Sequence, residues 1–190
     1  MRNVLQQEVK YKFTMGMILG AMLSALILGD EKPKSAKPEP LSPSEKIFLV
    51  AELLERATND LGLDAHNITD ESYPPKVIVT NQEMIEHIVC KNNGCVALGA
   101  ANQDAIFIAD SIDLRSVKGK GILFHEIVHA LQNIQFGRAS YDCDEWVRRE
   151  EEAYALQNKW VSERGLDDPW LTQVLEKQKQ VCDEWIGGGY

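Results

Sequence analysis

The sequence lacks the features that would set it apart from ordinary globular proteins. It has no excess of basic residues: 20 Lys and Arg stand against 29 Asp and Glu, a formal net charge of −9. Because a general nucleic-acid binder needs a basic surface against the phosphates, we expect no nucleic-acid partner. Four cysteines are too few for a small protein built on disulfides. With 44% hydrophobic and 26% charged residues, the 190-residue chain has enough apolar side chains for one ordinary core.

Long hydrophobic runs are missing too, except near the N-terminus. Residues 13–29 (FTMGMILGAMLSALILG) carry no charge and follow Arg2, Lys10 and Lys12. A basic start followed by an apolar segment of this length is typical of a secretory signal peptide and approaches the length of a membrane anchor. We therefore expect an exported protein (periplasmic, secreted or membrane-anchored), with residues 1–29 cleaved or kept as a tether. A buried core helix is the less favoured alternative.

A linker and one folded domain account for the rest of the chain. Residues 30–43 (DEKPKSAKPEPLSP) hold four prolines and almost nothing apolar, which is typical of an extended linker. The domain then spans residues 44–190. Its apolar periodicity and turn residues predict a helix with Ser44 as N-cap, strands at 76–80, 96–98 and 105–109, and helices at 81–89, 117–136, 142 or 144 to about 163, and 168–186. This order of helix, small sheet and helical second half predicts an α+β fold.

One motif carries chemistry. Residues 125–129 read His-Glu-Ile-Val-His, an H-E-x-x-H sequence inside the predicted helix 117–136. Histidines four residues apart project from one helix face and can share one metal ion. Glu126 lies about 100° around the helix from His125, so its carboxylate can reach a water beside the metal without ligating it. Because a helix with two structural histidines is the competing interpretation, the motif needs a third ligand to support it.

The third ligand has to come from outside the motif helix. No histidine follows His129, and a catalytic zinc site uses three protein ligands with one open position. The next predicted helix contains three consecutive glutamates, including Glu150 and Glu152. Each shares a helix face with apolar residues, so the sequence alone leaves both as candidates, and a solvated acidic face is the ordinary interpretation of either.

The motif together with the glutamate-bearing helix resembles a known family. H-E-x-x-H followed by a helical E-x-x-A is similar to the gluzincin clan of zinc metallopeptidases, especially its minimal single-domain members. The wider segment, residues 105–160, also resembles uncharacterised exported bacterial H-E-x-x-H proteins. The resemblance implies that His125, His129 and Glu150 bind Zn²⁺, that Glu126 is the general base and that Ala153 permits close helix packing. Glu152 with Ala155 also fits E-x-x-A.

The resemblance further implies a zinc-dependent hydrolase, a metallopeptidase acting on a peptide or protein substrate. An oxyanion-stabilising donor would be needed, and Tyr141 or Tyr154 could supply it. Many gluzincins have an aspartate where this chain has Tyr154, so the partners that orient the histidines are left unassigned. In such peptidases an edge strand lines the cleft; residues 105–109 could be that strand or equally a core strand.

In an oxidising compartment the cysteines would pair as Cys90–Cys95 and Cys143–Cys182, one of three possible connectivities. The alternative function is an exported metal-binding scaffold or interaction domain without proteolytic activity, and hydrolysis of a non-peptide amide is a third possibility.

Overall fold

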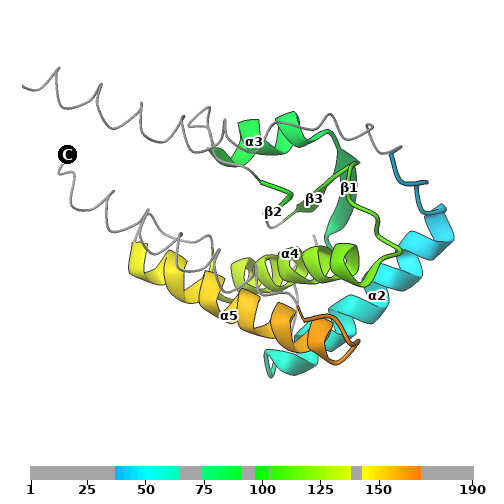
Figure 1. Cartoon of the computed structure of the whole chain (residues 1–190). Helices are drawn as coiled ribbons and strands as arrows, with labels where there is room; N and C mark the ends of the chain where they lie inside the picture. Colours follow the sequence, from blue (N-terminus) through cyan, green and yellow to red (C-terminus); the bar gives the residue numbers. More distant parts are fainter. Residues whose placement is uncertain (1–36, 65–73, 91–96, 103, 138–142, 168–190) are drawn as a thin grey trace, which may run out of the picture. The chain divides into compact units, whose positions relative to one another are not determined.

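Four helices and a small sheet make up the regular structure of residues 37–64, 74–90, 97–102, 104–137 and 143–167, the part that our computed structural model describes (Figure 1). All of these residues belong to one unit, Lys37–Tyr190. The elements are, in order, α2 (Pro43–Asp60), β1 (Lys76–Thr80), α3 (Gln82–Cys90), β2 (Gly99–Ala101), β3 (Ala105–Ala109), α4 (Val117–Phe136) and α5 (Cys143–Ser162). The predicted α+β class with a helical C-terminal half is confirmed.

Some of the sequence-based expectations concern other residues. The apolar segment 13–29, the first half of the linker (30–36) and the last predicted helix, 168–186, lie outside the described part. Within that part, no helix combines the length and the apolar character needed to cross a membrane.

The sheet is mixed, with strand order β1-β3-β2. β1 runs parallel to β3, with Lys76 opposite Ala105, and β2 runs antiparallel to it, with Gly99 opposite Ile108. β3 is therefore the central strand, and its Ile106 and Ile108 are fully buried. Of the two roles left open for residues 105–109, the structure shows the core strand and not the edge strand.

The strand expected at residues 96–98 is wrong in position. Strand β2 covers Gly99–Ala101, a stretch whose composition predicts a turn. It forms because β3 supplies the partners: the Leu98 carbonyl accepts from the Ala109 N–H, and the Asn102 N–H donates to the Ala105 carbonyl. The turn follows at Asn102, whose side-chain oxygen accepts from the N–H groups of Asp104 and Ala105. Non-local pairing thus outweighs the low β-propensity of Gly-Ala-Ala.

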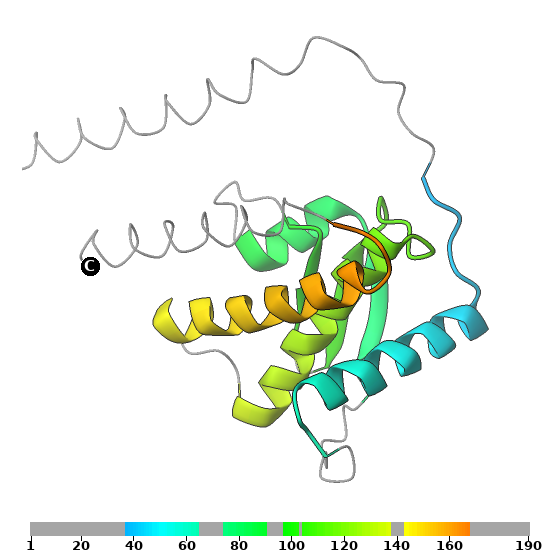
Figure 2. The same ribbon diagram turned by 60° about the horizontal axis from the view of Figure 1, so that its bottom comes forward.

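Helix α4 is the central element of the domain. It contacts β2 and β3 on one side and α2 and α5 on the other, as Figures 1 and 2 show. Its bounds match the prediction because local signals define them: the Ser116 hydroxyl accepts from the Gly119 N–H, and Gly137 ends the helix at φ 74°. Most of its middle is buried, including Leu123, Phe124 and residues 125–128 of the motif.

Small residues let α4 approach its neighbours closely. A Cβ atom on Gly121 would lie 2.6 Å from Cγ1 of Val161 on α5, and one on Gly119 would lie 2.0 Å from the Asp113 carbonyl oxygen. Ala153 on α5 is fully buried. Larger side chains at these positions would force α4 away from its neighbours, and with it the histidines.

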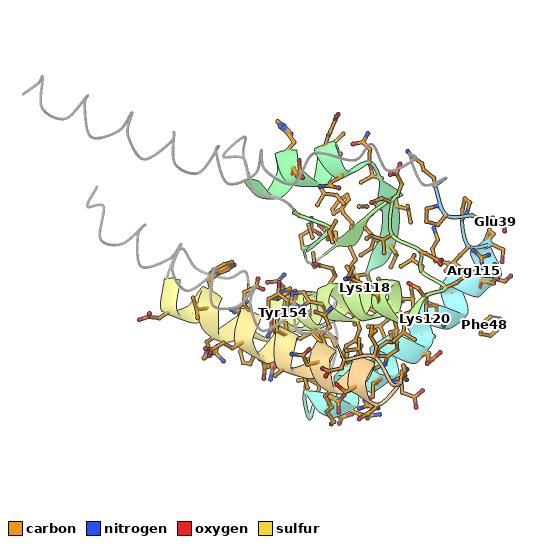
Figure 3. All side chains as sticks on the ribbon, in the orientation of Figure 1. Glu39, Phe48, Arg115, Lys118, Lys120 and Tyr154 are labelled. Carbon is orange, nitrogen blue, oxygen red and sulfur yellow. The ribbon has the colours of Figure 1, made fainter. Side chains whose placement is uncertain are left out.

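The first helix begins two residues earlier than the predicted cap implies. Ser42 caps α2, Pro43 occupies its first turn, and Ser42 and Glu45 form a reciprocal capping box. The chain before the cap is held against the loop that precedes α4, where Arg115 donates to the Glu39 carbonyl at 2.6 Å (Figure 3). The end of the predicted linker is thus attached to the folded domain.

Asp60 joins α2 to α5. Its carboxylate accepts from Arg56 at 2.5 Å and from Lys159 at 2.8 Å. Burial would raise the pKa of Asp60, but the hydrogen bonds from Lys159 and Arg56 outweigh burial and hold it below the usual 3.8. The ionised carboxylate therefore stabilises the packing of α2 on α5.

We predict that Asp60→Asn lowers the free energy of unfolding at pH 7 by about 1–2 kcal/mol, the size expected for charge-assisted hydrogen bonds with one half-exposed partner. Because the folded-state pKa is depressed, this stabilisation is present above the unfolded value of 3.8 and fades as the pH falls through the folded pKa. Urea unfolding at pH 7 and at pH 3 measures the difference. Exposed Asp104→Asn is the control, and a deficit that is equal at both pH values would contradict the prediction.

Candidate metal centre

The two motif histidines lie next to each other on α4. One helical turn separates His125 and His129, and their Nε2 atoms are 3.0 Å apart. Their rings meet edge to face, with centroids 4.6 Å apart. His125 is buried and His129 nearly so. The helical placement predicted from the spacing is therefore what the structure shows.

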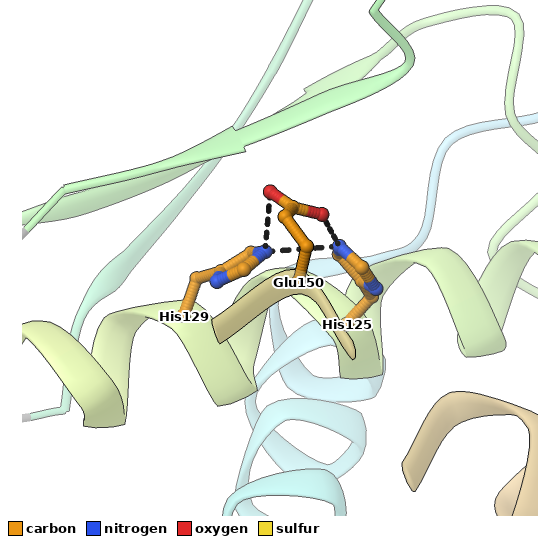
Figure 4. Close-up of side chains that lie close together, drawn as sticks. All are labelled: His125, His129 and Glu150. Atoms are coloured by element: carbon orange, nitrogen blue, oxygen red, sulfur yellow. Dashed lines mark hydrogen bonds and ion pairs between the residues drawn. The ribbon is translucent and has the colours of Figure 1, made fainter. Parts of the chain in front are cut away.

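Glu150 on α5 points its carboxylate at both rings. One oxygen, Oε1, lies 3.3 Å from Nε2 of His129, and the other, Oε2, lies 3.5 Å from Nε2 of His125 (Figure 4). Together the three residues form a group of nitrogen and oxygen atoms that could hold a metal ion.

The spacing of these atoms fits a small tetrahedral cation. An ion with metal–ligand bonds of about 2.0–2.1 Å has ligand atoms about 3.3 Å from one another. The two Nε2 atoms are 3.0 Å apart, and each lies 3.3 or 3.5 Å from the carboxylate oxygen that faces it, Oε1 for His129 and Oε2 for His125. The nitrogen atoms come from α4 and the oxygen atoms from α5. The donor set and these distances thus fit a site in which three residues hold one metal ion.

Without a cation, protons must supply the positive charge of this group. Burial would lower the pKa of His129, but the Glu150 carboxylate outweighs burial and raises it to about 9. The same contact, acting against burial, holds the pKa of Glu150 well below its usual range. Burial lowers the pKa of His125. One buried carboxylate beside two imidazoles therefore attracts positive charge, which a metal ion can provide in place of a proton.

Glu126 lies beside the group without belonging to it. It is buried, and burial raises its pKa to about 7. Its carboxylate occupies the space next to Gly99 of β2, where a Cβ atom would come within 2.5 Å of Oε1. Glu126 is thus a carboxyl group held between α4 and β2 with a pKa near neutrality, which suits a general base.

Glu152, the other candidate for third ligand, has a different partner. Its Oε2 accepts from the side-chain amide of Gln132 at 2.9 Å. The same Gln132 faces Nδ1 of His129 at 2.8 Å. Gln132 therefore stands between Glu152 and His129, whereas Glu150 contacts both histidines directly.

With this geometry in view, comparison with known proteins gives one result. Residues 47–183 match the family described as a domain of unknown function, DUF6647. The chain belongs to this family. No curated protein and no solved structure matches it. The matched range contains all of α3, α4, α5 and the sheet, so the histidine–glutamate group lies within the DUF6647 domain.

The remaining sequence-based candidates in this DUF6647 chain fall into two groups. Tyr154 packs its ring against His125, with centroids 4.3 Å apart, on the side of α5 that faces α4 (Figure 3). Tyr141 lies outside the described residues. So do Cys95 and Cys182, and the side chains of Cys90 and Cys143 are not described either, so both disulfides stay predictions.

Two residues at the site, Gln132 and Gly99, are not among those predicted from the sequence. Gln132 follows His129 by three positions, one helical turn, and this spacing was a usable signal for a contact with the ring. Gly99 carried no such signal, because its role depends on β2 pairing with β3 and lying over α4.

We predict that Glu150→Ala weakens binding of divalent metal by more than about 100-fold, since it removes the one negative charge and the one oxygen donor that face both histidines. Calorimetric titration with Zn²⁺ measures the affinity. Glu151→Ala, from the same acidic triplet, is the matched control and should bind as the wild type does, whereas Glu152→Ala, which removes a partner of Gln132, should weaken binding several-fold at most. Loss of binding in Glu152→Ala alone would show that the third ligand has been assigned wrongly.

Proposed function

We propose that this DUF6647 protein is a zinc-dependent metallopeptidase, with His125, His129 and Glu150 as the zinc ligands. The observation that carries the proposal is the convergence of two Nε2 atoms and a carboxylate at 3.0–3.5 Å. Two imidazoles and one carboxylate form a common donor set of catalytic zinc, and three protein ligands leave a position for reactant. This agrees with the resemblance of the motif to the gluzincin clan.

Zinc in this position would make water a stronger acid and polarise a carbonyl group. The protein's own contribution begins with Glu126, which takes a proton from the attacking water and passes it to the leaving amine. Burial between α4 and Gly99 keeps this carboxyl group at a pKa of about 7, so it can both accept and release a proton near neutral pH. A bound cation would shift that pKa downward and favour the ionised base.

A peptide substrate is favoured by the position of β2. Leu98 and Asn102 direct their backbone groups at β3. Because backbone groups alternate along an antiparallel strand, Gly99 and Ala101 direct theirs to the opposite edge of β2. Gly99 is also the residue against which Glu126 packs. An extended peptide added to this edge would therefore run beside the general base.

Export is part of the same proposal. It rests on the sequence alone, on the uncharged run 13–29 after Arg2, Lys10 and Lys12. An exported hydrolase would meet its substrate outside the cytoplasm, and retention of the segment would tether the enzyme to a membrane.

We predict that Glu126→Gln lowers the rate of peptide hydrolysis by about 10²–10⁴-fold while the protein still binds one equivalent of zinc, because the amide cannot accept the proton. The zinc-loaded protein is incubated with unfolded casein, and new peptide termini are quantified by mass spectrometry. Glu55→Gln, an exposed position on α2, is the matched control and should cleave at the wild-type rate.

Two results would contradict the proposal. Equal rates for Glu126→Gln and the wild type would remove Glu126 as the base. A wild-type protein that binds zinc and cleaves no peptide would favour the exported metal-binding scaffold instead.

A further inference from the structure

Gln132 is a fully buried polar side chain whose amide is hydrogen-bonded at both ends. Its Oε1 lies 2.8 Å from Nδ1 of His129. Its Nε2 lies 3.1 Å from the Arg149 carbonyl and 2.9 Å from Oε2 of Glu152. Burying an amide is unfavourable unless its polar groups are hydrogen-bonded, and here each of them has a partner. These partners show what the side chain holds in place.

The partners fix which way the amide points. The Arg149 carbonyl and the Glu152 carboxylate can only accept hydrogen bonds, so the group that faces them must be the amide NH₂. The opposite end, facing His129, must then be the amide oxygen, which can only accept. Nδ1 of His129 therefore has to carry a hydrogen.

That assignment determines the chemistry of the other ring nitrogen. A neutral imidazole with its hydrogen on Nδ1 has its lone pair on Nε2, the atom that faces His125 and Glu150. We propose that Gln132 is a positioning residue for the metal centre, holding His129 in the tautomer and orientation in which Nε2 is the ligand atom. This inference rests on the proposed zinc site.

The same amide also fixes the position of the third ligand. Its two acceptors, Arg149 and Glu152, lie on either side of Glu150 in the sequence of α5. Gln132 thus links α4 to α5 beside Glu150, whose side chain projects from α5 toward the histidines. One side chain orients a ligand on its own helix and sets the position of a ligand on the neighbouring helix.

The two histidines are held differently. Nδ1 of His125 is buried and makes no hydrogen bond of normal geometry in the described part of the chain, although the side chain of Gln157 lies close enough to act on the pKa of the ring. Its ring packs instead against the ring of Tyr154, with centroids 4.3 Å apart. Orientation by hydrogen bonding therefore acts on His129, through a glutamine on the same helix.

The test compares Gln132→Met with Gln135→Met, the same substitution at an exposed position one turn further along α4. We expect Gln132→Met to bind Zn²⁺ about 10- to 100-fold more weakly than the wild type, the usual effect of removing a partner of a metal-ligating histidine. Gln135→Met should bind as the wild type does. Affinity is measured by competition with a chelator, and thermal unfolding of the metal-free proteins checks that each variant folds.

A double variant separates positioning from packing. Gln132→Glu combined with Glu152→Gln exchanges carboxylate and amide, so that an oxygen again faces His129 and the amide donor comes from α5. We expect it to recover part of the affinity lost in Gln132→Met, because an acceptor again faces Nδ1 of His129 while the Arg149 carbonyl loses its donor. If Gln132→Met does not fold, Glu152→Ala removes the exposed partner of the Gln132 amide and should still weaken zinc binding several-fold.

A spectroscopic readout is independent of zinc. In the ¹⁵N-labelled metal-free protein, the ring hydrogen on Nδ1 of His129 should give a slowly exchanging, downfield signal that disappears in Gln132→Met and persists in Gln135→Met. Zinc affinity of Gln132→Met within twofold of the wild type, or an unchanged ring signal, would overturn the inference. If the wild type binds no zinc, the proposed function fails, while the ring signal still decides whether Gln132 orients His129.

Discussion

The structure depends on the contact between α4 and α5, where one buried carboxylate meets two imidazoles. Glu150 lies within 3.5 Å of Nε2 on both His125 and His129. Placing an ionised carboxylate there is unfavourable unless positive charge accompanies it. The raised pKa of His129 and the depressed pKa of Glu150 are two expressions of this requirement. A metal ion would meet it with a geometry that the donors already fit.

The rest of the domain brings these helices into place. Gly121 lets α5 approach α4 closely, and Ser116 and Gly137 define the ends of the motif helix. The sheet covers the other side of α4, and β2 packs Gly99 against Glu126. Apolar burial around the group strengthens its electrostatic interactions and excludes competing water. The contacts that pack α4 against α5 and β2 therefore also position the side chains of the site.

Local signals in the sequence were enough for the motif helix but not for its surroundings. The bounds of α4 follow from its cap and its terminal glycine, and the facing of His125 and His129 follows from helical spacing. β2 could not be placed, because three small residues become a strand only through pairing with β3. The choice between Glu150 and Glu152 needed the structure as well. Both lie on an amphipathic helix, and only its packing on α4 decides which one reaches the histidines.

The proposed site holds one zinc ion between a ligand from α5 and two from α4. Anomalous diffraction at the zinc absorption edge, from crystals of the zinc-loaded protein, locates such an ion. We predict a single peak about 2.0–2.2 Å from Nε2 of His125, Nε2 of His129 and a carboxylate oxygen of Glu150. A peak bound by the Glu152 carboxylate, or no peak between the two histidines, would contradict it.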